Sequence, residues 1–520
     1  MGCMSSSHNK ISCEKPGPRY FIKNKKAKGQ KMIEKVEVFF SLVGTPYQDM
    51  SNLKLVLNYS LHQQLNYTKI GETEEIRSGE TNYATYFVID YSFEVHQYLQ
   101  INLIQNNICL NTITTTLGYV IGSRLNQFDF NVDRLGRDFG IRVSTRRAQS
   151  NMNSQRLYFF ANVTNVHNLS GDYYLTILNN HTKLNKWKKV FKTKEGRGPY
   201  FRLEMDQVNF NDVSMNNADR PFKVQLCKFR AGVVGEVQTT LNSLNSQTIF
   251  NIGTFQVELK YEFKTRIKFF DYLQRGLQIS FMVGIDYTGS NGVYTSPSSL
   301  HYIYGNSPNQ YEQAITQCGG IIENYDYDRK FPVYGFGGLL PGQSETSHFF
   351  NVNLRDDPEA IRIDGIIHYY KQSLNRIQLS GPTYFAPMIK SVVNNIKANF
   401  KNGGNMTNVY YVLLILTDGL ILDMAETRNA ICKAAKYPFS IIIVGIGNSS
   451  DLGSMEELDG DGNLPLRNKK GKKIKRDIVQ FVKYNKFKNN PDEFAKQLLC
   501  EIPFQVEEYF DIFHSFNPLR

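Results

Sequence analysis

Three oxygen-bearing side chains stand at alternate positions directly after an apolar run, in the segment DYTGSN. They are Asp286, Thr288 and Ser290. In an extended loop alternate side chains face the same way, so one carboxylate and two hydroxyls converge on one point. Oxygen ligands of this kind, with several retained waters, suit Mg²⁺. A capping Asp or Ser at the start of a helix gives the same letters, so the pattern predicts either a magnesium site or a helix cap.

The elements that would position these residues lie in the second half of the chain, where three nearly continuous apolar runs alternate with three helical segments. The runs cover 277–286, 411–419 and 439–447, and the helical segments cover 311–325, 387–400 and 424–436. Strands that are apolar on both faces belong to a parallel sheet covered by helices on both sides. Asp286 and Asp418 stand at the ends of two runs, where open parallel sheets bind ligands. We therefore predict an α/β open-sheet domain over 265–520 with a site at this edge.

The first half of the chain is rich in short strands. Between 36 and 260, β-branched and aromatic residues occur in short alternating runs separated by Asn, Ser and Gly, without long helical periodicity. This texture is typical of antiparallel sandwiches. Two all-β antiparallel units are predicted, over 31–149 and 150–264, and their end loops are the expected carriers of function.

Composition limits the classes of function. The 520 residues are enough for about three or four domains. No apolar stretch of about 18 residues or more occurs, which argues against a membrane-spanning helix. The seven cysteines form no CxxC pair, so neither a disulfide framework nor a zinc module is supported, and an intracellular, reducing compartment is expected.

The formal net charge of +12 is concentrated in two basic segments. Residues 1–35 hold nine Lys or Arg against two Glu, and residues 467–476 read RNKKGKKIKR, with seven bases. A solvated surface is expected for the second segment, and its functional alternative is binding to anionic phosphates of lipid or nucleic acid. Aromatic residues are not interleaved with these bases, so no nucleic-acid partner is predicted.

The N-terminus, MGCMSSSHNK, fits a double acylation. Gly2 with Ser6 matches the M-G-x-x-x-[ST] pattern for a myristate, and Cys3 is placed for a palmitate. One acyl chain holds a protein weakly, and a polybasic patch strengthens the attachment. The lysines of this patch are Lys23, Lys25, Lys26, Lys28 and Lys31. We predict that 1–30 form a flexible acylated arm on the cytoplasmic face of the plasma membrane, with a cytosolic pool of the protein.

Further segments belong with DYTGSNG and carry a family resemblance. They are GPTYFAP (381–387), TDGLILDMAET (417–427), FSIIIVGIG (439–447), RDIVQFV (476–482), SLHYI (299–303), IIENYDYDRKFPVYGFG (321–337) and IDGI (363–366). Together they resemble the von Willebrand factor A domain of the copine family, from about Phe270 to Phe510. The resemblance implies two C2 domains ahead of the A domain, in agreement with the two strand-rich units.

The resemblance also implies a metal-ion-dependent adhesion site. Its ligands would be Asp286, Thr288, Ser290, Thr383 and Asp418, holding Mg²⁺ or Mn²⁺. In the family the metal keeps one coordination position for an acidic residue of a partner, which makes the site a docking point. No Ser/His/Asp or Cys/His constellation and no phosphate-binding glycine loop accompanies these residues, so no enzymatic activity is predicted.

Carboxylates are scarce in the loops where C2 domains hold Ca²⁺. Residues 95–128 contain no Asp or Glu, and Asp49 is the one candidate in the first loop of the first unit. In the second unit Asp172 stands alone, while Lys228 and Arg230 take places where acidic residues would stand. Their positive charges argue against Ca²⁺ at this unit. We expect both side chains to contact anionic headgroups instead.

The sequence as a whole predicts a copine-like peripheral membrane adaptor. Acyl groups and basic residues would attach it to anionic phospholipids, and the Mg²⁺-dependent A domain would recruit a protein that presents an acidic residue. The alternative is a conventional calcium-dependent phospholipid-binding protein. A ubiquitin ligase of the RING type would need the paired cysteines that the sequence lacks.

Overall fold

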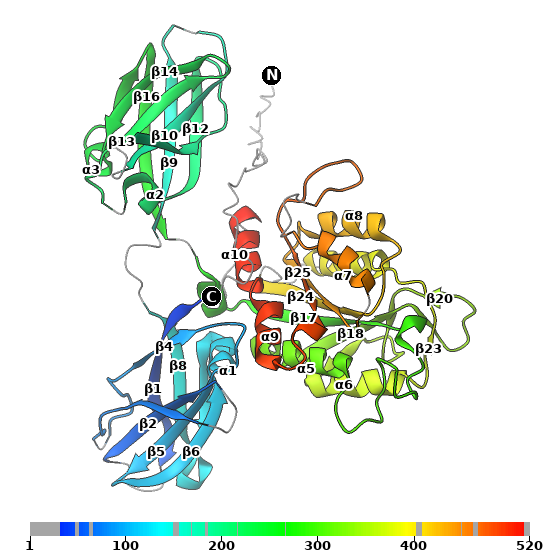
Figure 1. Cartoon of the computed structure of the whole chain (residues 1–520). Helices are drawn as coiled ribbons and strands as arrows, with labels where there is room; N and C mark the ends of the chain where they lie inside the picture. Colours follow the sequence, from blue (N-terminus) through cyan, green and yellow to red (C-terminus); the bar gives the residue numbers. More distant parts are fainter. Residues whose placement is uncertain are drawn as a thin grey trace, which may run out of the picture. The chain divides into compact units, whose positions relative to one another are not determined.

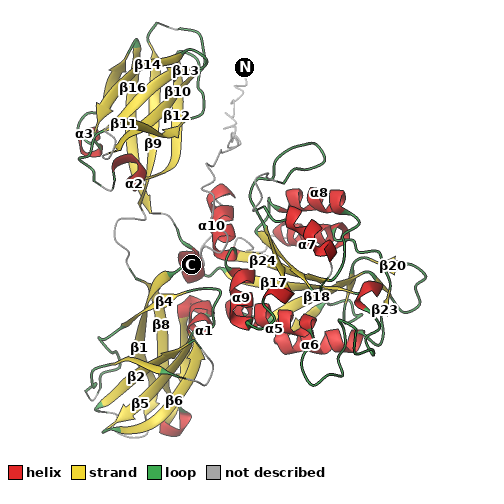
Figure 2. Ribbon diagram, viewed as in Figure 1, coloured by secondary structure: helices red, strands yellow, loops and turns green. Residues whose placement is uncertain are grey.

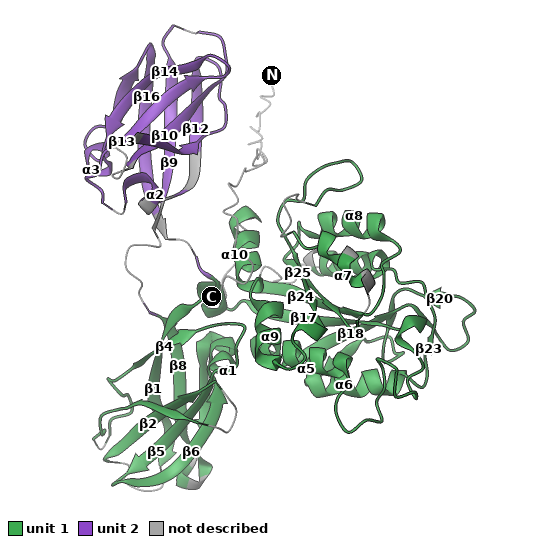
Figure 3. Ribbon diagram, viewed as in Figure 1, with its two compact units in different colours: residues 1–147, 269–520 green, residues 148–268 purple. Residues whose placement is uncertain are grey.

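The computed structural model describes most of the chain and divides it into two compact units (Figure 3). The described residues are 32–46, 51–61, 66–77, 79–148, 155–167, 169–181, 186–215, 217–265, 267–401, 408–448, 450–460 and 466–513. Unit 1 comprises 1–147 and 269–520, and unit 2 comprises 148–268. Gly2, Cys3, Asp49 and the five lysines of the N-terminal patch lie outside the described residues. In the described part, no helix is long and apolar enough to cross a membrane.

Unit 1 begins with an antiparallel sandwich. Its strands are β1 (Glu34–Pro46), β2 (Leu53–Ser60), β3 (Thr68–Glu72), β4 (Phe87–Tyr91), β5 (Tyr98–Gln105), β6 (Ile108–Thr116), β7 (Gln127–Asn131) and β8 (Gly136–Arg147). They form two four-stranded sheets, ordered β4-β1-β8-β7 and β3-β2-β5-β6. Alternate residues of β1 are buried, which is the period-2 burial of a strand with one face in a core. A short helix, α1 (Leu117–Gly122), follows β6.

Unit 2 is a second antiparallel sandwich. Its strands are β9 (Gln155–Asn165), β10 (Tyr173–His181), β11 (Lys186–Lys192), β12 (Tyr200–Asn209), β13 (Phe222–Lys228), β14 (Gly232–Thr239), β15 (Ile249–Ile252) and β16 (Phe255–Thr265), with helices α2 (Phe210–Ser214) and α3 (Leu241–Leu244). The sheets are ordered β11-β10-β13-β14 and β12-β9-β16-β15. Apolar side chains from both sheets fill one core. The predicted all-β architecture is therefore confirmed for both sandwiches.

The remainder of unit 1 is an α/β layer structure. Its parallel strands are β17 (Gln278–Asp286), β18 (Lys330–Phe336), β24 (Val409–Thr417), β25 (Phe439–Gly445) and β26 (Val479–Lys483). Its short strands are β19 (Gly338–Leu339), β20 (Thr346–Ser347), β21 (Phe350–Asn351), β22 (Glu359–Ile361) and β23 (Gln378–Leu379). Its helices are α4 (Phe269–Gln274), α5 (Gln310–Ile322), α6 (Arg362–Ser373), α7 (Ala386–Lys401), α8 (Met424–Ala434), α9 (Pro491–Leu499) and α10 (Ile502–Phe513).

Helices cover both faces of this sheet, with α7 and α8 on one side and α5, α6 and α9 on the other (Figures 1 and 2). The central strands run parallel in the order β18-β17-β24-β25-β26. Because both faces are covered, β25 is buried along its whole length. The predicted α/β open sheet is confirmed.

The strand order places a switch point beside the predicted site. From β17 the chain continues to β18 on one side and later to β24 on the other, so the loops that follow β17 and β24 diverge. Ligand crevices of open α/β sheets lie at such points, beyond the carboxyl ends of the strands. Asp286 ends β17, and Asp418 directly follows β24.

The first sandwich and the α/β layer share a close contact within unit 1. Helix α1 packs against the 3₁₀ turn Glu323–Tyr325, and glycines allow the approach. A Cβ on Gly122 would lie 1.7 Å from the backbone oxygen of Asn324, and one on Gly118 would lie 2.8 Å from the Tyr325 hydroxyl. The hydroxyls of Tyr91 and Tyr325 are 2.7 Å apart and buried. This contact explains why the two parts belong to one compact unit.

Carboxylates from both parts of unit 1 meet the start of α4. Glu34 accepts a hydrogen bond from the Phe270 backbone amide (3.2 Å), and Glu507 accepts one from the Phe269 amide (3.0 Å). These are amides that a helix leaves unpaired at its first turn. Burial raises the pKa of Glu34 to about 7, with a further contribution from the nearby charge of Glu507. Arg147, the last residue of β8, forms an ion pair with Asp271 at 2.8 Å.

Candidate metal centre

The side chain of Asp286 is fully buried at the end of β17 and holds the loop that follows. Its Oδ1 accepts hydrogen bonds from the Thr288 backbone amide (2.8 Å) and from the Thr288 hydroxyl (2.6 Å). Its Oδ2 accepts one from the hydroxyl of Thr417, the last residue of β24 (2.6 Å). The aspartate therefore ties the ends of two adjacent parallel strands together.

Ser290 and Asp418 continue this arrangement toward solvent. The hydroxyls of Thr288 and Ser290 are 3.0 Å apart, and the Ser290 hydroxyl donates to Asp418 Oδ1 at 2.9 Å. Ser290 is exposed, whereas Asp286, Thr288 and Asp418 are buried. The structure thus brings four of the five predicted ligands into one hydrogen-bonded chain that reaches the surface at Ser290.

Thr383, the fifth predicted ligand, lies in the segment before α7 and close to Gly419. A Cβ placed on Gly419 would lie 3.5 Å from the Thr383 hydroxyl and 3.7 Å from the Ser290 hydroxyl. The backbone carbonyl of Thr383 also accepts a hydrogen bond from the Leu422 amide (3.1 Å). The absence of a side chain at Gly419 leaves space between two hydroxyls that could serve as ligands.

The electrostatics of this cluster favour a cation. Burial raises the pKa of Asp286 to about 7, with a smaller contribution from the nearby charge of Asp418. Burial also raises the pKa of Asp418. Two carboxylates crowded in a poorly solvated place are each harder to ionise, and a bound dication reverses that cost.

The donor set suits a hard metal ion. Among the described residues no group of three or more His, Cys, Asp or Glu is placed to hold a metal. A cation here would take two carboxylates, three hydroxyls and water, which is the chemistry of Mg²⁺ or Mn²⁺. The residues present fit such an ion, and their role as ligands stays a prediction.

Asp418 is held in place by two residues that the sequence did not predict. The Asn291 side-chain amide donates to Asp418 Oδ1 at 3.1 Å. The Tyr311 hydroxyl donates to Asn291 Oδ1 at 2.7 Å, which fixes the orientation of that amide. Asn291 directly follows Ser290 in DYTGSN, so its position beside the predicted ligands was the available signal; Tyr311, on α5, gave none.

A buried histidine also supports the loop. The nitrogen Nε2 of His301 lies 2.9 Å from the backbone carbonyl of Asp286, which can only accept, so Nε2 carries the proton. Nδ1 therefore accepts from the Tyr370 hydroxyl at 2.8 Å. Burial lowers the pKa of His301 to about 3, which keeps the ring neutral. His301 belongs to SLHYI, a segment that carried the family resemblance without revealing this role.

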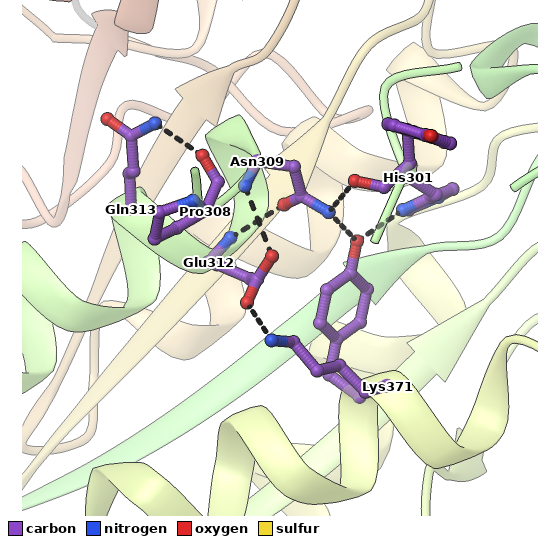
Figure 4. Close-up of polar contacts among 8 residues, drawn as sticks. His301, Pro308, Asn309, Glu312, Gln313 and Lys371 are labelled. Atoms are coloured by element: carbon purple, nitrogen blue, oxygen red, sulfur yellow. Dashed lines mark hydrogen bonds and ion pairs between the residues drawn. The ribbon is translucent and has the colours of Figure 1, made fainter. Parts of the chain in front are cut away.

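The capping of α5 holds this support in place (Figure 4). Asn309 caps α5 by accepting from the Glu312 backbone amide (3.0 Å), while its own backbone amide donates to the Glu312 carboxylate (3.1 Å). The Asn309 side chain also donates to the Tyr370 hydroxyl (3.1 Å), and Lys371 pairs with Glu312 at 2.6 Å. Helices α5 and α6 thereby fix Tyr370, and through it His301.

In unit 2 the predicted basic residues lie at the turn between β13 and β14. Lys228 ends β13, with its ammonium 5.8 Å from the centre of the Tyr173 ring. Arg230 lies in the turn, 5.3 Å from the ring of Phe229. The Phe229 amide donates to the backbone carbonyl of Asp172 (2.8 Å), so this turn adjoins the 166–172 loop. The end of the sandwich thus combines basic side chains with exposed Phe229.

The corresponding turn of the first sandwich is uncharged. β5 and β6 are joined by Asn106 and Asn107, both with positive φ, a conformation that Asn tolerates well. Ile108, next to this turn, is exposed. The structure therefore adds no carboxylate to this described turn.

In sequence, two antiparallel sandwiches precede an open α/β sheet with an oxygen-rich cluster at its switch point. Residues 299–517 match the family model described as Copine. This match confirms, over 299–517, the copine resemblance predicted from the sequence. The matched region contains Thr383 and Asp418 and begins after Ser290.

The chain is also similar to several solved structures. A structure titled BON1-C2B is 12% identical, with 22% of this chain and 97% of that chain covered and a TM-score of 0.20. The calcium-bound pair of C2 domains from extended synaptotagmin 2 is 10% identical, with 45% and 96% covered and a TM-score of 0.17. The manganese-loaded TRAP protein of Plasmodium vivax is 12% identical, with 41% and 70% covered and a TM-score of 0.26.

Proposed function

We propose that this protein is a copine-like peripheral membrane adaptor that recruits a protein partner through a divalent cation in its A domain. The observation that carries the proposal is the hydrogen-bonded oxygen cluster at the switch point of the sheet. Asp286 and Asp418 supply the charge, and the hydroxyls of Thr288, Ser290 and Thr383 supply further oxygens. When bound, Mg²⁺ or Mn²⁺ would offer a free coordination position to a carboxylate of the partner.

Docking suits this site better than catalysis. A hydroxyl nucleophile needs an adjacent general base to take its proton. The hydroxyls of Thr288 and Ser290 donate to aspartates, and a carboxylate that binds a cation is too weakly basic to take their protons. His301 is neutral, and both of its ring nitrogens are engaged with Asp286 and Tyr370. We therefore assign a binding role to the site.

Membrane attachment would come from two regions. Myristate on Gly2 and palmitate on Cys3, together with the N-terminal lysine patch, would anchor the arm to anionic phospholipids on the cytoplasmic face of the plasma membrane. The turn of unit 2 would add Lys228 and Arg230 as headgroup contacts, with Phe229 exposed between them. Neither contact requires Ca²⁺, in contrast to the alternative of a calcium-dependent phospholipid-binding protein.

Partner capture with and without the cation tests the docking role. Full-length wild-type protein and the variants Asp286→Asn and Asp356→Asn would be used as bait in Mg²⁺ and in EDTA. Asp356 is an exposed carboxylate of the same domain outside the cluster and serves as the matched control. We expect proteins retained by wild type and by Asp356→Asn in Mg²⁺ to be lost in EDTA and with Asp286→Asn. If the same proteins are retained in EDTA and by Asp286→Asn, the cluster has only a structural role.

A further inference from the structure

The second basic segment folds into a well-formed hairpin rather than a loose loop. The Ile474 amide donates to the carbonyl of Leu466 (2.8 Å), and Arg467 pairs with Lys473 as an antiparallel bridge. At the turn, Oδ1 of Asn468 accepts from the backbone amides of Lys470 and Lys472, at 3.0 and 2.9 Å. Gly471 takes a positive φ of 71° that the turn requires. The backbone that carries the bases at the tip is therefore held by defined hydrogen bonds.

The base of the hairpin is anchored in the core. Leu466 is buried and Ile474 packs against the core cluster of the A domain. Arg476, the last residue of the basic run, is completely buried and donates to the carbonyls of Tyr437 (2.7 Å) and Phe439 (2.6 Å). The expectation of a solvated surface is therefore wrong for Arg476, whose guanidinium instead satisfies buried carbonyls.

The rest of the hairpin presents a concentrated positive charge. Its exposed bases are Arg467, Lys469, Lys470, Lys472, Lys473 and Lys475. Among the described residues, the ion pair that involves this set is Lys469 with Glu426. The other five bases have no described carboxylate within ion-pair distance. Like charges so close together repel one another and favour an anionic partner.

An ion pair joins the hairpin tip to the helix that follows the loop beginning at Asp418. Glu426, which pairs with Lys469, is in the first turn of α8. Helix α8 begins directly after the loop 418–423, which starts at Asp418 and contacts Thr383 through the Leu422 amide. Between these two points the side chains of Leu420 and Leu422 are 42% and 62% exposed. The loop that starts at Asp418 thus carries the two exposed leucines. The first turn of α8, which follows this loop, pairs with the basic tip of the hairpin.

We propose that this hairpin is a second recognition surface, which selects partners that carry an acidic segment next to the carboxylate bound at the metal centre. The proposal rests on the proposed docking function and specifies its partner. A metal ion and a row of ammonium groups select the same chemistry, clustered carboxylates, and the two leucines would accept apolar side chains between them. The hairpin bears no aromatic side chain on which a nucleic-acid base could stack.

The test uses a synthetic fluorescein-labelled peptide of alternating Glu and Gly, and a Gln–Gly peptide as its neutral control. Binding to the full chain would be followed by fluorescence anisotropy in Mg²⁺ and in EDTA. The hairpin variant is Lys470→Glu with Lys472→Glu. The matched control is Lys486→Glu with Lys488→Glu, which makes the same change in net charge at two exposed lysines elsewhere in the domain. Thermal melts of all variants check that each is folded.

We expect the hairpin variant to bind the acidic peptide about tenfold more weakly than the control variant, since two exposed charge contacts are reversed. Equal affinities of the two variants, or no binding of the acidic peptide to wild type, would overturn the proposal. Anionic vesicles of phosphatidylserine and phosphatidylcholine would be added as competitors. If the vesicles bind more tightly than the peptide, and displace it only when the hairpin is intact, the hairpin is a membrane-binding surface instead.

The same measurements distinguish a failure of the metal-dependent docking from a failure of the hairpin proposal. Hairpin-dependent binding that is equal in Mg²⁺, in EDTA and with Asp286→Asn would support the hairpin and contradict the metal-dependent docking. Mg²⁺-dependent binding with the same affinity in wild type and in the hairpin variant would support the docking and overturn the hairpin proposal.

Discussion

Replacing Gly122 by Ala tests whether the first sandwich and the α/β layer are one body. The new Cβ would lie 1.7 Å from the backbone oxygen of Asn324 and 2.6 Å from its carbonyl carbon. A backbone group cannot move aside as a side-chain end can, so α1 must separate from the Glu323–Tyr325 turn. Overpacking of this kind costs about 1–3 kcal/mol, and Ala gains up to about 1 kcal/mol over Gly in a helix. Because the clash at 1.7 Å is with backbone, the upper end of this cost applies, and subtracting the helix gain leaves a net loss of about 2 kcal/mol.

Calorimetric melting of the full chain measures this loss. Because the unfolding entropy is about 2.1 cal/mol/K per residue, a destabilisation of about 2 kcal/mol lowers the Tm of a unit of about 400 residues by about 2–3 °C. The matched control is Gly320→Ala in α5, whose Cβ would lie 3.7 Å from the His96 side chain of the first sandwich, an ordinary contact. Gly320→Ala should leave the Tm unchanged or raise it. A Tm of Gly122→Ala equal to or above that of wild type would refute the close packing of α1.

Three further predictions concern the junction and the membrane. Burial raises the pKa of Glu34 from its ordinary 4.5 to about 7, so the folded protein keeps a proton that the unfolded chain releases; stability should fall by up to about 3 kcal/mol as pH rises from 4.5 to 7. In urea unfolding, Glu34→Gln should reduce this dependence of the unfolding free energy on pH. An unchanged dependence would show that another group causes it. Gly2→Ala should move most of the protein from the membrane to the soluble fraction of cells, and Cys3→Ser only part; full membrane retention of Gly2→Ala would exclude the acyl anchor. Vesicle sedimentation of Gly2→Ala protein should show no steep rise with Ca²⁺, because the β13–β14 turn presents Lys228 and Arg230, which repel a cation. A steep rise would favour the calcium-dependent alternative.

The A-domain strands were predictable because each is apolar on both faces. The run 277–286 corresponds to β17, which differs by one residue at its start. The run 411–419 corresponds to β24, which begins and ends two residues earlier, so that Asp418 and Gly419 lie in the loop. That shift matters for the site, since a residue past the strand end is free to turn toward the neighbouring loop. Local apolar patterning is thus enough to place the two aspartates at one edge of the sheet.

The supporting residues were not predictable, because their partners are remote in sequence. His301, in a turn, is positioned by Tyr370, which lies 69 residues away on helix α6. Arg476 ends a run of exposed bases, and only the tertiary fold turns it into the core. The packing of α1 on the turn before Asp326 depends likewise on contacts more than 200 residues apart, such as Tyr91 with Tyr325. Periodicity carries no information on such pairs.

Direct metal binding tests most simply whether Asp286 and Asp418 form a metal centre. Mn²⁺ would be titrated into the full chain, with the free-ion EPR signal as the readout and Mg²⁺ as competitor. We predict a saturable site in wild type and in Asp356→Asn for which Mg²⁺ competes. The site should be lost in Asp286→Asn. Mn²⁺ binding that is the same in wild type and in Asp286→Asn, with both variants folded, would contradict a metal centre at the ends of β17 and β24.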